Sequence, residues 1–179
     1  MDDDQRRRLR RTPYPGEVID HLRNAKGTLF SFEILPPLKG RDIRSIYEGI
    51  DPLMEFKPPF IDVTYHREEY VYKVKENGLL EKRSIRQRPG TVGICAAIQH
   101  NYKVDTVPHI ICGGFSKEET ENALIDLHFL GIDNVLVLQG DGIKNEGKFV
   151  PEPDGHKFAS DLLQQVVNMN NGRYLEEEL

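Results

Sequence analysis

The sequence contains few cysteines, no long apolar run and no excess of positive charge. Cys95 and Cys112 are its two cysteines, and they do not form a Cys-x-x-Cys pair. Because the N-terminus also lacks an apolar signal segment, this pattern predicts free thiols in a reducing cytosol rather than a secreted, disulfide-bonded domain. No apolar stretch is long enough to cross a bilayer. We therefore expect a cytoplasmic protein with no membrane partner.

Metal-binding and nucleic-acid-binding patterns are also missing. The six histidines are scattered, without the spacing of a zinc motif such as His-Glu-x-x-His. The net charge is −5, whereas a duplex-binding protein is normally basic. The arginine cluster near the N-terminus suits a nucleic-acid arm, but no basic face continues beyond it, so we interpret residues 1–16 as a solvated tail. We expect neither a metal site nor a nucleic-acid partner.

Residues 17–179 have the length and composition of a single globular domain. Hydrophobic residues make up 38% of the chain and charged residues 30%, which is enough for a core. Apolar spacing predicts one helix and then four strands that each precede a helix. The strands are predicted within residues 28–35, 60–66, 107–115 and 134–141, and the helices within 17–25, 41–56, 91–101, 116–130 and 156–170.

Three local signals refine this pattern. Residues 67–90 predict an inserted β-hairpin, because two strand-like runs flank a turn at Asn77-Gly78. Ser116 and Glu119 have the spacing of a capping box at the start of a helix. Pro52 is expected to kink or split the helix that contains it.

The alternation of strands and helices predicts a parallel sheet with right-handed crossovers. A dinucleotide-binding doubly wound sheet normally carries Gly-x-Gly-x-x-Gly after its first strand, and this sequence does not. A β/α barrel has eight strand–helix units in roughly 250 residues, of which this chain provides four. We therefore predict an α/β fold of the (β/α)8 TIM-barrel type, with about the first four units present.

Glu33 interrupts an otherwise apolar strand, and side-chain alternation predicts where it points. Its apolar neighbours share one face of the strand, which places Glu33 on the other. Because helices cover the outside of a barrel, the polar face is expected to look inward, where such barrels hold their sites near the carboxyl ends of the strands. Each polar residue has an ordinary structural explanation when taken alone, and their convergence indicates a site without naming a reaction. The residues are Glu33, Asp62, Thr64 and His66, joined by His109, Gln139 and Asp141 on the later strands.

Five segments together resemble a known family. FSFEILPP, FIDVTYH, VPHIICGGFSKEE, GIDNVLVLQGD and HKFASDL are similar, in this order, to the N-terminal half of methylenetetrahydrofolate reductase, over about residues 17–170. The resemblance implies an FAD-binding β/α barrel that reduces 5,10-methylenetetrahydrofolate to 5-methyltetrahydrofolate with NADH or NADPH. It also implies a homo-oligomer that serves one-carbon metabolism and methionine biosynthesis.

The resemblance assigns roles to individual residues. Glu33 matches the family's general acid, which protonates the departing folate nitrogen, and we expect Phe32 and Ile34 to desolvate it and favour its protonated form. Asp141 matches an aspartate at the flavin ring, whose negative charge disfavours the anionic reduced flavin and so favours hydride release. The positions that match FAD contacts are Thr64, His109, Gln139, Gly140, Asp141, Phe158 and Ala159.

The sequence departs from the family pattern in several places. Gln139 stands where many members have arginine, which removes a charged contact to FAD. Phe158 replaces a tyrosine of some members, so stacking survives but a hydroxyl contact does not. The hairpin over residues 67–90 is longer than in minimal members, and it is placed either to cover the cofactor or to form a subunit contact.

The length of the chain leads to the last expectation. The family's later strands carry further FAD contacts and most folate contacts, so we predict a truncated reductase that binds FAD weakly and turns over poorly alone. One alternative is a non-catalytic half-barrel module that associates with itself or with another chain. A second, an unrelated phosphate-binding β/α enzyme, is disfavoured because the sequence has no glycine-rich phosphate loop.

Overall fold

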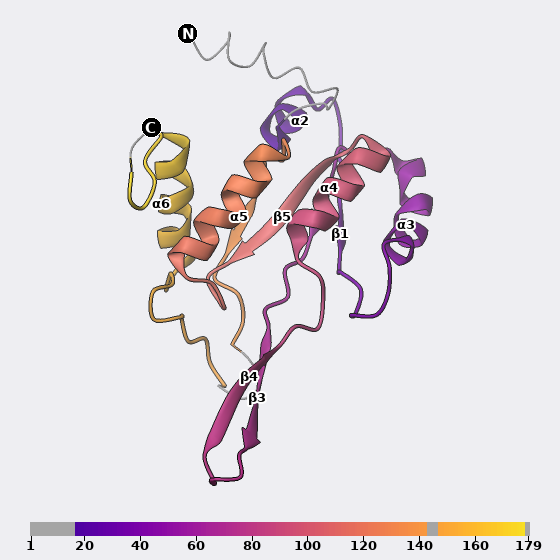
Figure 1. The fold of residues 1–179 in the computed structure, drawn as a ribbon. Coiled ribbons are helices and arrows are strands. Elements are labelled where there is room, and N and C mark those ends of the chain that lie inside the picture. The colour runs from indigo at the N-terminus through magenta and orange to yellow at the C-terminus, as the bar shows by residue number, and fades with distance from the viewer. Residues whose placement is uncertain (1–16, 143–146, 178–179) are drawn as a thin grey trace.

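The structure, a computed structural model, describes residues 17–142 and 147–177. The predicted tail, residues 1–16, lies outside the described residues. Four parallel strands form the main sheet (Figure 1). In their spatial order they are β1 (Phe32–Ile34), β2 (Phe60–Val63), β5 (Asp105–Ile111) and β6 (Leu136–Leu138).

Each of these strands is followed along the chain by a helix, and a short helix, α2 (Val18–Asn24), precedes β1. The others are α3 (Arg44–Ile50) with the 3-10 helix η1 (Asp51–Phe56), α4 (Thr91–Tyr102), α5 (Lys117–Phe129) and α6 (Ala159–Asn170). The predicted α/β fold with a parallel sheet is therefore confirmed. Closure of this sheet into an eight-stranded barrel stays a prediction.

The core lies between one face of the sheet and the helices. Ile61 and Val63 of β2 are fully buried there, against side chains such as Ile50 of α3, Ile98 of α4 and Leu127 of α5. Because alternate residues of a strand point to opposite faces, this packing directs the residues between them to the face without helices. The predicted apolar alternation in the second strand is thus confirmed.

The strands are shorter than predicted because few residues find a hydrogen-bonding neighbour. β1 pairs with β2 from Phe32 to Ile34 only, opposite Ile61 to Val63. Pro58 and Pro59 precede β2 and cannot donate backbone hydrogen bonds, so the residues of the chain before Phe32 have no strand to pair with. The last helix also begins late, at Ala159, because the Asp161 carboxylate accepts the backbone N–H of Phe158 (3.2 Å) and fixes a helix start there.

The local predictions are confirmed. Ser116 and Glu119 form the capping box of α5, with the Ser116 hydroxyl oxygen 3.1 Å from the Glu119 nitrogen. The helix around Pro52 is split, since α3 ends at Ile50 and continues as η1. The inserted hairpin is present as β3 (Glu69–Val74) and β4 (Leu80–Ile85), and it stands out from the body of the domain (Figure 1).

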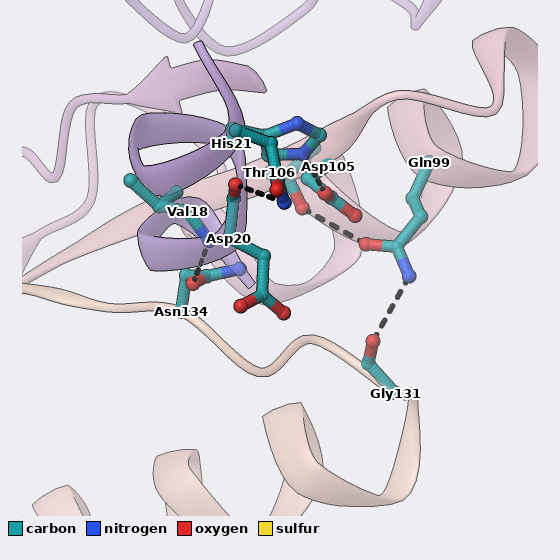
Figure 2. A network of polar contacts seen from close by, with 9 residues as sticks. Val18, Asp20, His21, Gln99, Asp105, Thr106, Gly131 and Asn134 are labelled. Atoms are coloured by element: carbon teal, nitrogen blue, oxygen red, sulfur yellow. Dashed lines mark hydrogen bonds and ion pairs between the residues drawn. The ribbon is translucent and has the colours of Figure 1, made fainter. Parts of the chain in front are cut away.

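Polar contacts connect α2 to the amino ends of the strands (Figure 2). His21 contacts the Asp105 carboxylate (2.6 Å), and the backbone N–H of Val18 donates to the side chain of Asn134 (2.9 Å). Gln99 of α4 receives a hydrogen bond from Thr106 of β5 (3.3 Å) and donates one to the carbonyl of Gly131 (3.0 Å). These contacts close the amino end of the sheet, which leaves its carboxyl end for a site.

Within the described ranges, no helix is both long and apolar enough to span a bilayer.

We predict that replacing the capping serine, Ser116→Ala, lowers the free energy of unfolding by about 1 kcal/mol, because the Glu119 N–H loses its acceptor. Urea denaturation followed by circular dichroism measures the change. The matched control is Ser160→Ala in the first turn of α6, an exposed position that should leave the midpoint unchanged. Equal midpoints for the two variants would contradict a stabilising cap.

We also predict that both cysteines resist alkylation in the native protein. Burial raises the pKa of Cys95 to about 12 and also raises the pKa of Cys112, and only the thiolate reacts. Iodoacetamide at about pH 8 should modify them only after unfolding, because the pKa of an unfolded cysteine is about 8.5. The same shift predicts a pH effect on stability. Because Cys95 stays protonated in the folded protein at a pH at which it is ionised in the unfolded chain, the free energy of unfolding should fall as the pH rises above about 9. Rapid native labelling would contradict this.

Candidate active site

The candidate site lies on the face of the main sheet opposite the one on which the described helices pack. Glu33 of β1 and Asp62 of β2 are direct neighbours in the strand register, and Asp62 is in turn the neighbour of Val107 on β5. His109 lies two residues further along β5 on the same face. Thr64 follows β2, and its hydroxyl donates a hydrogen bond to Oε1 of Glu33 (2.6 Å). Three adjacent strands thus bring four of the predicted polar residues together.

Glu33 is exposed, and its surroundings differ from those we predicted. Phe32 packs against Phe56 of η1, with ring centroids 6.0 Å apart, and Ile34 packs against the core. Both side chains lie on the helix-covered face, opposite the carboxylate. The expectation that Phe32 and Ile34 desolvate Glu33 is therefore wrong, because residues adjacent in a strand cannot shield one another's side chains. Within the described residues the Glu33 carboxylate forms no ion pair with a basic side chain. Its side-chain hydrogen bond is the one it accepts from Thr64.

Asp62 is the half-buried carboxyl group of this face. Burial raises its pKa, His109 on β5 opposes this change, and the neighbouring Glu33 carboxylate adds to it. Two carboxyl groups in direct register resist being ionised together, because each charge repels the other. This face of the sheet therefore favours the protonated form of Asp62 more than water does.

His109 is buried, with 4% of its surface exposed, although it carries a polar ring. Its Nε2 atom has no hydrogen-bond partner among the described residues. A buried polar atom without a partner costs free energy, and in native proteins it often marks a place where another group binds. The ring is thus a candidate contact for a ligand lying on this face.

The remaining predicted residues gather where β6 ends and α6 begins. The side-chain amide of Gln139 donates to the carbonyl of Lys157 (2.8 Å), which ties the two segments together. Gly140 adopts a left-handed conformation (φ +81°), and a β-carbon there would lie 3.3 Å from Ile111, so the position suits glycine. Phe158 is half exposed, with the Lys157 ammonium 5.2 Å from its ring centre.

The structure leaves these two groups of residues separate. Within the described residues no hydrogen bond or ion pair joins the Glu33 side to the Gln139 side, which lie on the two outer strands of the sheet. Asp141 is exposed beyond the end of β6, and Ala159 opens α6. His66 is exposed past the end of β2.

Sequence reasoning missed a buried arginine at the same end of the sheet. The Arg67 side chain is only 9% exposed and lies against Gly113, where a β-carbon would come 3.3 Å from its Nη1 atom. Its guanidinium contacts Glu152 (3.5 Å), which also receives the Tyr70 hydroxyl (3.4 Å). This cluster attaches the segment before α6 to the end of β2. The sequence signal for this contact is the pair Gly113-Gly114 after a strand, because glycines without side chains let another segment approach the backbone closely.

No group of three or more His, Cys, Asp and Glu side chains in residues 17–142 and 147–177 could hold a metal ion.

Comparisons with known proteins agree on one family. The sequence profile described as methylenetetrahydrofolate reductase matches residues 18–176. Methylenetetrahydrofolate reductase (NADH) 1 of Zea mays is 28% identical over 153 residues, which cover 84% of this chain and 23% of that protein. The 5,10-methylenetetrahydrofolate reductase of Pectobacterium carotovorum is 27% identical over 141 residues, covering 79% of this chain and 40% of the relative.

A third relative gives the same result. The 5,10-methylenetetrahydrofolate reductase of Escherichia coli (strain K12) is 27% identical over 133 residues, 74% of this chain and 38% of that protein. The chain thus spans between about a quarter and two fifths of the length of these relatives. Because the profile match covers nearly all of its length, the chain belongs to the methylenetetrahydrofolate reductase family.

Proposed function

We propose that this chain carries the proton-donating side of an FAD-dependent reductase, which converts 5,10-methylenetetrahydrofolate to 5-methyltetrahydrofolate with NADH or NADPH. The observation that supports the proposal best is the Glu33–Thr64 pair on the open face of the sheet (2.6 Å). An exposed carboxyl group held by one neighbour, at the carboxyl end of parallel strands, has the position and reach of a general acid.

Thr64 orients the proposed acid. Its hydroxyl donates to Oε1 of Glu33, which leaves Oε2 to carry the transferable proton. Asp62 lies beside Glu33 on the next strand, and burial together with the nearby Glu33 carboxylate raises the pKa of Asp62. We infer that Glu33 delivers the proton of its Oε2 atom to the departing ring nitrogen of the folate, with Asp62 as its electrostatic neighbour.

Residues of both groups fit a flavin. His109 presents a buried Nε2 with no hydrogen-bond partner among the described residues, Gly140 leaves its position free of a side chain, and Phe158 offers a half-exposed aromatic ring. FAD, when bound, supplies the hydride for the reduction. One of the two amide N–H groups of Gln139 is used by the Lys157 carbonyl, which leaves the other N–H and the amide oxygen for a ligand. Asp141, exposed at the end of β6, is the proposed acidic neighbour of the flavin ring.

We further propose that the sheet is part of a TIM-type barrel. Its strands are parallel and, apart from the hairpin, follow the order of the sequence. Helices pack on one face, while the polar residues and the exposed Leu136 and Leu138 of β6 occupy the other. This two-sided arrangement is what the wall of a β/α barrel requires, with its site at the carboxyl ends of the strands.

We predict that Glu33→Gln lowers the rate of folate reduction by at least about 100-fold, because general acid catalysis contributes on that order. Reduction of the flavin by NADH or NADPH should change less than twofold, since that half-reaction needs no proton from Glu33. The two rates are measured separately by stopped flow, on the natural full-length enzyme that contains this chain. Glutamine can still accept the Thr64 hydrogen bond, so the local structure is retained.

The control for this variant is Glu55→Gln, an exposed carboxylate of η1 on the helix side of the sheet. It should leave both half-reactions unchanged. An equal loss of both rates in Glu33→Gln would remove Glu33 from the acid role.

We predict that His109→Leu weakens FAD binding about tenfold, because a hydrogen bond from a buried group is worth roughly that much. The free energy of unfolding should stay the same or increase, since an unpartnered buried nitrogen is replaced by an apolar group. Fluorescence titration gives the dissociation constant, and His100→Leu at an exposed position of α4 is the control. Unchanged affinity for FAD, or a marked loss of stability, would contradict the proposed contact.

A further inference from the structure

The β3–β4 hairpin leaves much of its apolar surface uncovered. Its strands pair with each other over six residues each, and near its base Tyr70 contacts Glu152 and carries the Lys82 ammonium over its ring (3.6 Å). Further out, Tyr72 is 59% exposed, Val74 73% and Leu80 65%. A two-stranded ribbon by itself is marginally stable in water, so this surface calls for a partner.

The register of the hairpin shows which backbone groups are available. At the turn, the N–H of Lys75 donates to the carbonyl of Leu79 (2.8 Å). Because hydrogen-bonded and non-bonded pairs alternate along antiparallel strands, Val74 opposite Leu80 and Tyr72 opposite Lys82 are non-bonded pairs. Tyr70, Tyr72 and Val74 therefore direct their N–H and C=O groups to the free edge of β3, and their side chains share one face.

We propose that β3 pairs, edge to edge and antiparallel, with β3 of a second copy of this chain, with Tyr72 at the two-fold axis. In this register all three edge-facing residues form hydrogen bonds, since Tyr72 meets Tyr72 of the other copy and Tyr70 meets Val74. Aromatic pairs and pairs of an aromatic with a β-branched residue are favourable neighbours across strands. The result is a four-stranded antiparallel sheet in which Tyr70, Tyr72 and Val74 of both copies lie next to one another on one face.

The charges along β3 match this register. On the other face of the strand, Glu69 of one copy lies opposite Lys75 of the other, at both ends of the contact. Within its own hairpin Lys75 pairs with Glu81 (3.2 Å) and remains half exposed, whereas Glu69 is exposed and makes no ion pair within the described residues. The new contact thus gives Glu69 a partner and places Lys75 between two carboxylates.

The other edge of the hairpin disfavours self-pairing. Leu80, Lys82 and Ser84 direct their backbone groups to the free edge of β4, by the same alternation. If β4 paired with β4 of a second copy in a register centred on Glu81, Lys82 or Arg83, that residue would lie opposite the same residue of the other copy at the two-fold axis. Each of these registers therefore brings two like charges together. Like charges directly opposite are destabilising, and charged edges are a common protection against strand pairing. The charge pattern therefore favours β3 as the interface.

Analytical ultracentrifugation of the full chain tests the proposal, and we expect a reversible dimer. Tyr72→Pro should make the chain monomeric, because proline removes an edge-facing N–H while leaving the bonds to β4 intact. The matched control is Leu80→Pro, which removes an edge-facing N–H from β4 and should leave the dimer unchanged. A monomeric parent chain would overturn the proposal, and it is the result expected if the hairpin instead covers a ligand of its own chain. Equal dimerisation of the two proline variants would overturn it as well.

A charge exchange tests the register. Glu69→Lys and Lys75→Glu should each raise the dimer dissociation constant about tenfold, since each creates two like-charge contacts per dimer. Mixing the two variants restores opposite charges at both ends, so native mass spectrometry should show heterodimers in excess over both homodimers. A statistical mixture of dimers would reject the Tyr72-centred register.

Discussion

The constraint on which the rest of the structure depends is the position of β2 between β1 and β5. Its Ile61 and Val63 are fully buried beneath the helices. Because a strand alternates its side chains, that burial forces Asp62 and the following Thr64 onto the opposite face. The register then brings Glu33 and His109 alongside them. Apolar packing on one side of the sheet thus determines the chemistry available on the other.

Much of the fold could be predicted because local signals were strong and agreed with one another. The capping box at Ser116, the turn at Asn77-Gly78 and the break at Pro52 each depend on residues close in sequence. Strand lengths were overestimated because pairing depends on the neighbouring strand. No pattern within residues 28–35 reveals that Pro58 and Pro59 limit β2 and therefore shorten β1.

The candidate site was predicted in part, and the limits have a physical origin. Alternation was sufficient to put Glu33, Asp62 and Thr64 on one face, since it needs only the strand assignment. It could not give burial, which depends on the other elements: Glu33 is exposed, Asp62 is half buried, and the Nε2 atom of His109 has no partner within the described part of the chain. The Arg67–Glu152 contact joins residues 85 positions apart, so no local pattern marks it.

The contacts of α2 have a consequence for the order in which the domain assembles. Val18 and Asn134 are separated by 116 residues, and His21 and Asp105 by 84 (Figure 2). Contacts that close such long loops form late, because their entropic cost is compensated only when both partners are already in place. During synthesis α2 therefore has no docking surface until β5 and the segment before β6 have been made, and we expect α2 to be among the last elements to join the native structure.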